Sequence, residues 1–455
     1  METGMNLRDK DKHLLHPFTA LQEHEATGPH IMERARGIHV YDVDGNRYID
    51  AMAGLWCVNV GYGRAEIAEA MSEQVKKLSY YHSFMSFTTE PSVELAERLT
   101  SMAPGDLNHA FFCNSGSEAN DTHVKIVWYY NNLRGKPEKK KFIGRQGAYH
   151  GVTVVAASLS GLSSLQRGFD VPLDRFVHVS CPNVFWNKPE GMTEMEYSAH
   201  LSQELEEKII DEGPETVAAF IAEPVMGAGG VIPPPEGYFQ AISPVLKKYD
   251  VLLIADEVIC GFGRLGKWFG SQVYGIEPDL MTLAKGLTSG YIPMAACLLS
   301  DEIYEVLKSG TPELGVFAHG YTYTAHPVSA AAALKNLDII EEEGLVENAA
   351  RVGAYFQSSL RHAVADHPRV GDVRGLGLMA GVELIKDKEK KVPFELSEGV
   401  ARAMYNHLLK HGLICRPILN MLAFSPPLIV NTSDVDEIID RFVHGLDDLH
   451  RELSN

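Results

Sequence analysis

The sequence lacks the features that mark secreted and membrane proteins. Its six cysteines are scattered, with no CxxC pair and no Cys/His spacing typical of a zinc site. This distribution argues against a disulfide framework and favours a reducing compartment. No apolar run approaches the roughly 20 residues that cross a bilayer, and the N-terminus METGMNLRDKDK is charged where a signal peptide is apolar. We therefore expect a cytoplasmic protein.

Positive charge is also in short supply. The chain has 41 lysines and arginines against 60 aspartates and glutamates, which gives a formal net charge of −19. A surface this acidic repels nucleic acid and anionic membranes, so we expect neither as a partner. With 455 residues, the chain is long enough for two or three domains with a large core.

Histidines are frequent near the N-terminus but irregularly spaced. They are His13, His16, His24 and His30. A metal site is conceivable, but no ligand spacing recurs. We therefore predict no metal site and interpret these residues as solvated or capping histidines.

Strand-like and helix-like segments alternate along most of the chain. Several short apolar runs do not alternate with polar residues: HAFFC (109–113), TVAAFIAEP (216–224), VLLIADEV (251–258), PDLMTLA (278–284) and MAACLLS (294–300). Such runs are typical of strands that are buried on both faces. The sequence therefore predicts an α/β fold with a mostly parallel central sheet covered by helices.

Three units are predicted from shifts in pattern. GIHVYDVDGNRYIDA (37–51) predicts a hairpin that turns at Asp44-Gly45. After about residue 330, a long helix pattern is followed by the strand-like RVGDVRGLGLMAGVEL. We predict an N-terminal segment over 1–60 that packs with the small domain, a large domain over 61–330, and a small α+β domain over 331–455.

Lys285 is the only charged residue between Asp279 and Asp301. It follows a predicted strand, at the end where open α/β sheets build their sites. Burial lowers the pKa of a lysine and makes its amine nucleophilic. Alternatively, only the alkyl part is buried and the ammonium extends to solvent.

Asp256 ends the apolar run VLLIA and is followed by Glu257. Two adjacent carboxylates at a buried strand end need partners, and one partner could be a cation on a ligand, such as a protonated pyridine nitrogen. Pyridoxal phosphate chemistry requires a carboxylate at that place, because the protonated ring is the electron sink. A helix cap or a salt bridge would equally account for the residue.

Ser115, Gly116 and Ser117 follow the strand HAFFC and open a predicted helix. Free N–H groups at a helix N-terminus bind phosphate well, and Gly116 allows the backbone to approach a ligand closely. Ser115 and Glu118 also have the spacing of a capping box, so capping alone would explain the serines.

A competing motif is GFGRLG (261–266), which matches the dinucleotide fingerprint GxGxxG. The carboxylates of Asp256 and Glu257 precede it and would repel a pyrophosphate. The segment that follows it also lacks a pattern that opens a helix. Despite these two objections, a dinucleotide-dependent oxidoreductase remains the alternative function from a different class.

Together these elements resemble the class III, or ω-, aminotransferases, which are fold-type I enzymes with pyridoxal 5'-phosphate (PLP). The resemblance covers nearly the whole chain. It rests on motifs in matching order: LWCVNVGYG (55–63), NSGSEAND (114–121), AYHG (148–151), AEPVMGAGG (222–230), ADEVICGFGR (255–264), LAKGLTSGYIPM (283–294), GYTYTAHP (320–327) and RGLGLMAGVEL (374–384).

The resemblance implies roles for the residues that match these motifs. Lys285 corresponds to the Schiff-base lysine and proton shuttle, and Asp256 to the partner of the pyridinium. Tyr149 and Val258 correspond to the side chains on the two faces of the ring. The other matches to cofactor-binding positions are Ser115, Gly116, Ser117, Glu223 and Thr322. The family's threonine at this last position reaches the phosphate from the neighbouring subunit of a homodimer, and a tetramer is possible.

Within the family, the chain most resembles the branch that uses pyruvate with amines or ω-amino acids. Trp56 and Tyr149 match the substrate pocket, and Arg416 matches a mobile arginine that grips the acceptor's carboxylate. The resemblance implies transfer of an amino group to pyruvate in two half-reactions, giving alanine and an aldehyde or ketone. An aminomutase or a decarboxylase on the same scaffold remains an alternative.

Overall fold

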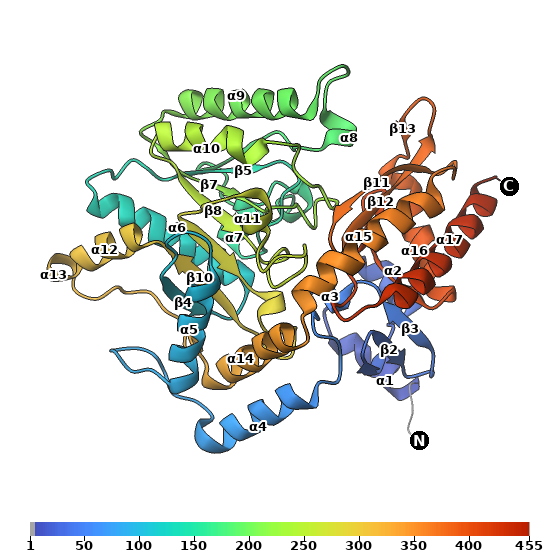
Figure 1. Ribbon diagram of the computed structural model, residues 1–455, viewed down its shortest axis with the longest axis horizontal. Helices are drawn as coiled ribbons and strands as arrows, with labels where there is room; N and C mark the ends of the chain where they lie inside the picture. The colour runs from blue at the N-terminus through green and yellow to red at the C-terminus, as the bar shows by residue number, and fades with distance from the viewer. Residues whose placement is uncertain (1–4, 455) are drawn as a thin grey trace.

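A seven-stranded sheet lies at the centre of the molecule, a computed structural model that describes residues 5–454 (Figure 1). Its order is β4-β10-β9-β8-β7-β5-β6. The sheet is parallel from β6 to β9, and β10 runs antiparallel to both of its neighbours. This confirms the mostly parallel sheet. The strands are β4 (His109–Cys113), β5 (Lys141–Arg145), β6 (Phe176–Val179), β7 (Val217–Ala222), β8 (Leu252–Asp256), β9 (Leu280–Leu283) and β10 (Ala295–Leu299).

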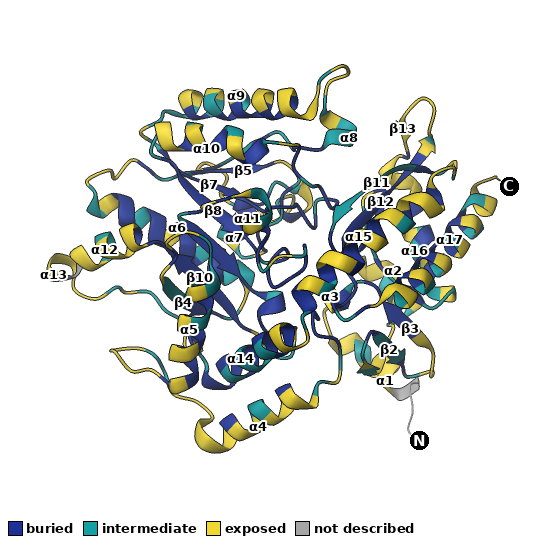
Figure 2. Cartoon of the chain, in the orientation of Figure 1, coloured by how far each residue is buried: buried dark blue, intermediate teal, exposed yellow. Residues whose placement is uncertain are grey.

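Both faces of this sheet are buried because neighbouring strand residues point to opposite sides. Phe220 and Leu253 pack beneath α9 (Glu194–Glu212) and α10 (Tyr238–Lys248). Ile221 and Ile254, one position further along, pack with α6 (Gly116–Leu133) on the other side. Figure 2 shows the strands in dark blue and the outer sides of the helices in yellow. This double burial is why the strands read as continuous apolar runs.

Further helices surround the large sheet. Helices α4, α5 and α14 pack together below it in the view of Figure 1, and α7 and α12 lie beside α6. The boundary predicted at residue 330 lies within α14, which begins three residues earlier. The helices not yet given bounds are α3 (Ala53–Trp56), α4 (Ala65–Leu78), α5 (Glu90–Met102), α7 (Val154–Leu159), α8 (Val184–Asn187), α11 (Gly270–Tyr274), α12 (Asp301–Ser309), α13 (Thr311–Leu314) and α14 (Pro327–Glu342).

A second sheet, of order β11-β12-β16-β15, forms in the C-terminal part, with β13 beside β12. Helices α15, α16 and α17 pack together against it. Its helices and strands are α15 (Leu345–Val364), β11 (Val370–Leu376), β12 (Met379–Asp387), β13 (Val392–Pro393), α16 (Val400–Lys410), β15 (Arg416–Ile418), β16 (Met421–Phe424) and α17 (Thr432–Ser454).

The predicted N-terminal hairpin is confirmed as β2 (His39–Asp42) and β3 (Arg47–Asp50). Its turn is tied by Asp42, whose carboxylate accepts the backbone N–H groups of Asp44 and Asn46. Two strands complete this sheet: β1 (Met32–Arg36) pairs with β2, and β14 (Leu413–Ile414) pairs with β3. The start of the chain, with α1 (Met5–Lys10) and α2 (Leu21–Thr27), thus lies beside its C-terminal part (Figure 1).

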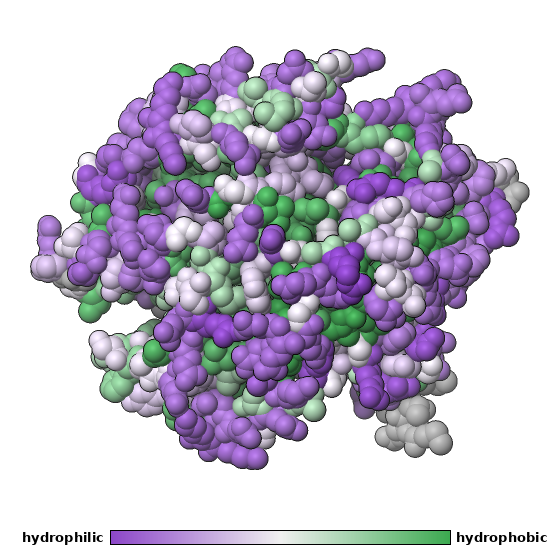
Figure 3. All heavy atoms as spheres, in the orientation of Figure 1, coloured by the Kyte–Doolittle hydropathy of each residue, from purple (hydrophilic) through white to green (hydrophobic). Residues whose placement is uncertain are grey.

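The outer surface is mainly hydrophilic on the face shown in Figure 3. Among residues 5–454, no helix combines the length and apolar character that a membrane-spanning segment requires.

Candidate active site

A cavity of about 780 Å³ lies at the carboxyl ends of β7, β8 and β9. In open α/β sheets this is the edge where ligands bind. The cavity brings together nine of the residues singled out in the sequence: Ser115, Gly116, Ser117, Tyr149, Glu223, Asp256, Val258, Lys285 and Arg416. Trp56 and Thr322 are not among its lining residues.

Lys285 enters this cavity from a strained turn after β9. Its backbone φ is +45°, a conformation that costs a non-glycine residue on the order of 1 kcal/mol. Asn336 of α14 holds the turn by donating to the carbonyls of Gly286 and Leu287. Within residues 5–454, the Lys285 amine has no hydrogen-bond or ion-pair partner. Burial therefore dominates and lowers the pKa of Lys285, against weaker opposing effects of Cys57 and Asp256.

Asp256, at the end of β8, is 3% exposed and faces the same cavity. Its Oδ2 accepts hydrogen bonds from His150 Nδ1 (2.8 Å) and Asn120 Nδ2 (3.0 Å), and its Oδ1 accepts the N–H of Val258 (3.1 Å). Burial acts to raise the pKa of Asp256, but the hydrogen bonds and charge of His150 outweigh it, so the pKa lies below its ordinary value. The carboxylate is therefore held ionised at neutral pH.

His150 and Asn120 are functional residues that the sequence analysis missed. Asn120 is oriented by Thr282, whose hydroxyl donates to Asn120 Oδ1 (2.7 Å), so its amide N–H groups point to Asp256 and to the carbonyl of His150. Asn120 belongs to the motif NSGSEAND, and His150 belongs to the motif AYHG. The signal in the sequence that could have identified Asn120 and His150 is a polar side chain placed between residues that are expected to be buried.

The segment 115–117 forms a cradle at the N-terminus of α6. Ser115 caps the helix by accepting the N–H of Glu118 (3.2 Å), as the capping reading predicts. The next N–H groups, of Gly116 and Ser117, have no acceptor within the helix. A Cβ on Gly116 would lie 2.9 Å from a methyl group of Val258. Ser115 therefore caps the helix, and the cradle also presents free donors to the cavity.

Ser117 is fixed by the loop that carries AYHG. Its hydroxyl accepts the N–H of Val152 (3.1 Å) and still has a proton to donate. Gly151 makes this approach possible, because its φ is +130° and a Cβ there would lie 2.4 Å from Ser117 Oγ.

Glu223 positions Tyr149 along the cavity wall. The Tyr149 N–H donates to Glu223 Oε1 (3.2 Å), and Oε2 accepts the N–H of Gly227 (2.8 Å). Burial raises the pKa of Glu223 above its ordinary value. Its two oxygens thus serve the backbone as acceptors beside the cavity.

Arg416 lies at the start of β15, across the cavity in the C-terminal part of the chain. Its side chain is half-buried, and within residues 5–454 the guanidinium has no hydrogen-bond or ion-pair partner. Burial lowers the pKa of Arg416, and Tyr149 acts in the opposite direction. A guanidinium stays protonated in proteins, so within residues 5–454 an unpaired cation faces the cavity across from the Lys285 amine.

Trp56 does not line the cavity of its own chain. It is 1% exposed and packs in an apolar cluster with Val225 and Ile259, and its indole N–H has no partner among the described residues. The backbone is kinked at this point, with a φ of +67° at Gly54 and +63° at Trp56. The neighbours Leu55 and Cys57 line the cavity, and the role of Trp56 toward the substrate stays a prediction.

Thr322 is exposed and lies outside the cavity of its own chain. Its carbonyl accepts the hydroxyl of Tyr80 (2.7 Å), which joins two surface loops. Its role toward the phosphate of a neighbouring subunit stays a prediction.

The second carboxylate, Glu257, has a structural role. It is fully buried and accepts the N–H groups of Gly270 and Ser271, which caps α11. Burial raises the pKa of Glu257 to about 7. Of the two adjacent acids, Glu257 therefore caps a helix, and Asp256 does not.

The interpretation of GFGRLG as a dinucleotide-binding motif is wrong. No helix follows the glycines directly, and a Cβ on Gly263 or Gly266 would meet Leu428 or Ala350 of the C-terminal part at under 3 Å. The glycines allow the two parts of the chain to pack closely. A dinucleotide site needs a helix N-terminus at this point.

The residues of the cavity fit PLP. The helix N-terminus at 115–117 supplies N–H and O–H donors for a phosphate, the ionised Asp256 suits a protonated ring nitrogen, and the unpaired amine of Lys285 suits an aldehyde. A ligand with these three groups would give each of these sites a partner, and Arg416 would remain unpaired.

Comparisons with known proteins agree with this geometry. A family model described as aminotransferase class-III matches residues 21–446. A solved ω-transaminase from Pseudomonas jessenii in complex with PMP superposes with a TM-score of 0.97 and 50% sequence identity, covering 98% of this chain and 99% of that one.

Two curated relatives are similar over nearly the whole chain. Gamma aminobutyrate transaminase 3 of Solanum lycopersicum, a chloroplast protein, is 46% identical over 445 residues, or 98% of this chain and 85% of the relative. A diaminobutyrate–2-oxoglutarate transaminase of Halomonas elongata is 46% identical over 448 residues, or 97% of this chain and 96% of the relative.

The contacts of Asp256 generate a first prediction. Asp256→Asn removes the negative charge that suits a protonated ring nitrogen, and a charge-assisted hydrogen bond contributes roughly 1.5–3 kcal/mol. We expect turnover per bound PLP to fall at least about tenfold, while PLP absorbance is retained. Steady-state kinetics, normalised to bound cofactor, would measure this.

The matched control is Glu257→Gln, which neutralises the neighbouring acid outside the cavity. Its turnover per bound PLP should stay near that of the unmodified enzyme. Near-normal turnover of Asp256→Asn would refute the role of Asp256.

Proposed function

The chain belongs to the class-III aminotransferases, PLP-dependent transaminases, and we propose that it moves an amino group from an amine or ω-amino acid to pyruvate. The observation that carries this proposal is that two basic side chains, Lys285 and Arg416, face one cavity and have no ion-pair partner within residues 5–454. One suits the cofactor, and the other remains for a substrate.

Arg416 suits the carboxylate of the acceptor. A guanidinium binds a carboxylate through two parallel hydrogen bonds, and partial burial strengthens such a pair. Among the residues that line the cavity, only Lys285 and Arg416 have lysine or arginine side chains. Because only one guanidinium is left for the substrate, the cavity favours an acceptor with one carboxylate. Pyruvate is such an acceptor.

The donor side of the cavity is apolar. Leu55, Ile259, Ile292 and Met294 line it, and none of them carries charge. These side chains suit the hydrocarbon part of an amine. An ω-amino acid would place its carboxylate on Arg416 in the first half-reaction, as pyruvate does in the second.

The remaining roles follow from the positions of the residues. Bound PLP supplies an electron sink that makes the proton next to the amino group removable. Lys285, with its pKa lowered by burial, is suited to take that proton and return it. Asp256 would keep the ring nitrogen of bound PLP protonated, and Tyr149 and Val258, which line the same cavity, would hold the ring between them.

A different acceptor, 2-oxoglutarate, is the second candidate. It is named as a substrate of the Halomonas elongata relative. Its additional carboxylate needs a second cation, which the cavity of this chain lacks among residues 5–454 apart from Lys285. Pyruvate is therefore the acceptor that the cavity favours.

The acceptor is tested by comparing pyruvate with 2-oxoglutarate at a fixed concentration of an aryl-alkyl amine. We expect alanine to form with a kcat/KM at least about tenfold above that for glutamate formation, as one unpaired buried charge costs 1–3 kcal/mol or more. Faster turnover of 2-oxoglutarate would reject pyruvate as the preferred acceptor.

Arg416→Ala should raise the apparent KM for pyruvate at least about tenfold, because a bidentate charge-assisted contact is lost. The apparent KM for an amine donor without a carboxylate should change little. Arg416→Lys serves as the conservative control and should restore part of the loss. Equal effects on both substrates would assign Arg416 a purely structural role.

We also propose a homodimer that shares its active sites. Two loops join near Thr322 and expose large apolar side chains, among them Met85 (81% exposed), Val316 (79%) and Tyr323 (59%). Several large apolar side chains exposed on neighbouring loops are typical of a protein interface. In the proposed dimer, this surface is covered and Thr322 reaches the phosphate cradle of the partner.

Dilution should therefore release PLP and separate the subunits together. Sedimentation velocity with PLP absorbance, followed across a dilution series, would measure both. Thr322→Ala should retain PLP less well than Thr432→Ala, a control at an exposed threonine that opens α17. A stable monomer with bound PLP and full activity would refute the shared site.

A further inference from the structure

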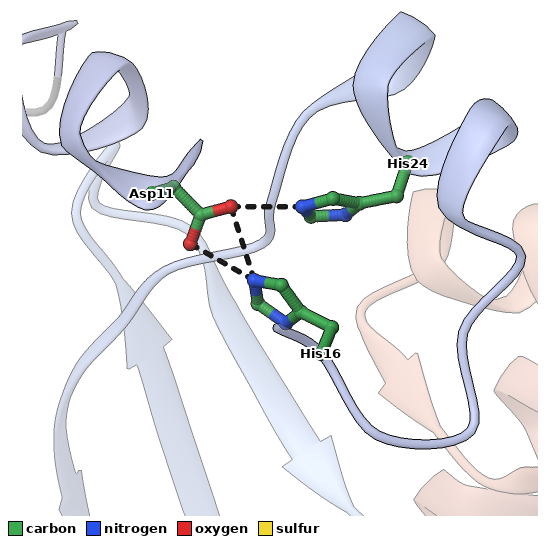
Figure 4. Close-up of side chains that lie close together, drawn as sticks. All are labelled: Asp11, His16 and His24. Atoms are coloured by element: carbon green, nitrogen blue, oxygen red, sulfur yellow. Dashed lines mark hydrogen bonds and ion pairs between the residues drawn. The ribbon is translucent and has the colours of Figure 1, made fainter. Parts of the chain in front are cut away.

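An aspartate and two histidines meet in the N-terminal segment (Figure 4). Asp11 lies in a short 3-10 turn, His16 in the following loop and His24 in α2. Asp11 Oδ2 lies 2.8 Å from His24 Nε2, and both Asp11 oxygens lie 3.0 Å from His16 Nε2. One ligand atom from each residue lies within 4.8 Å of the others.

We propose that Asp11, His16 and His24 form a binding site for a divalent transition metal ion such as Zn²⁺. Two imidazole nitrogens and a carboxylate oxygen are a donor set that Zn²⁺ favours, and three protein ligands leave a fourth position for water. Tetrahedral bonds of 2.0–2.2 Å place ligand atoms about 3.3 Å apart. Small side-chain rotations would open the observed separations to that value.

The convergence of the two rings favours an ion over hydrogen bonds alone. Both histidines direct Nε2, rather than Nδ1, at the same carboxylate oxygen, with ring centroids 4.2 Å apart. An ion between them would replace both N–H protons and bind all three groups at once. The side chains are 13–24% exposed, so solvent and ions have access.

The rest of the segment supplies little that would hold this loop in place. None of residues 7–30 is buried. Its side-chain contacts to the body of the molecule include the ion pairs Arg8–Asp44 and Glu23–Arg402, which lie on either side of the loop. Surface ion pairs of this kind stabilise weakly. A metal ion bound by three residues would fasten the loop more firmly.

This loop reaches the active-site cavity. Pro17 and Phe18 come directly after His16 and both line that cavity, although Phe18 is 74% exposed. Binding of a metal ion at His16 would thus fix two residues that border the cavity. The metal site itself is independent of the proposed acceptor and donor.

Metal content of the PLP-loaded enzyme tests this site. After removal of metal with a chelator, the protein is dialysed against Zn²⁺ at a low micromolar concentration and analysed by mass spectrometry of the elements. We expect about one Zn²⁺ per chain, because the three ligands form one site. Substitution of one ligand should weaken binding at least about tenfold, since even outer partners of ligands contribute 10–100-fold.

The variants are His16→Gln, His24→Gln and Asp11→Asn, each of which keeps a hydrogen-bonding group of similar size. His13→Gln is the matched control, because His13 is an exposed histidine of the same segment. Visible absorbance of bound PLP confirms that each variant is folded. Visible bands of Co²⁺, used in place of Zn²⁺, should be present in the control and lost from the three variants.

The proposal is overturned if the unmodified enzyme binds no Zn²⁺ above the level of His16→Gln. It is equally overturned if His13→Gln loses as much Zn²⁺ as the three ligand variants.

Discussion

Within residues 5–454, the Lys285 amine is buried and has no paired carboxylate, and this is the constraint on which the rest of the site depends. A charged amine in this place would be costly, so the pKa of Lys285 is lowered and the neutral, nucleophilic form is favoured. Asp256 balances this arrangement from β8. It keeps its charge because His150 and Asn120 donate to it, and it leaves Lys285 without a direct ion pair.

The fold provides this arrangement through the ends of neighbouring parallel strands. Glu223, Asp256 and Lys285 follow β7, β8 and β9, and the phosphate cradle follows β4. Arg416 reaches the same cavity from the second sheet. The cavity lining thus comes mainly from the ends of the central sheet, with Arg416 and Pro417 of the C-terminal part and Pro17 and Phe18 of the N-terminal loop.

Residues whose environment is set by nearby sequence were predictable. Lys285 stands alone in an apolar run, and Ser115–Ser117 follow a strand directly, so the central sheet and nine of the residues that line the cavity were identified. The burial of Trp56 was not apparent from the sequence, because it depends on the positive φ angles at Gly54 and Trp56 and on packing in the core. Two features depend on tertiary contacts, which the spacing of residues along the sequence does not reveal. They are the helix cap formed by Glu257 and the convergence of Asp11, His16 and His24. The donor amine leaves no pattern in the sequence, since apolar side chains such as Leu55 and Met294 accept many hydrocarbons.

We propose that Lys285 is the only lysine that forms a covalent bond with the PLP aldehyde, and a chemical label tests this most directly. Sodium borohydride makes the bond between a lysine amine and the PLP aldehyde permanent, so digestion and mass spectrometry can locate the attached cofactor. We predict one cofactor per chain, on the peptide that contains Lys285. Attachment at another lysine, such as the buried Lys139, or no attachment in an enzyme that retains PLP, would contradict the account.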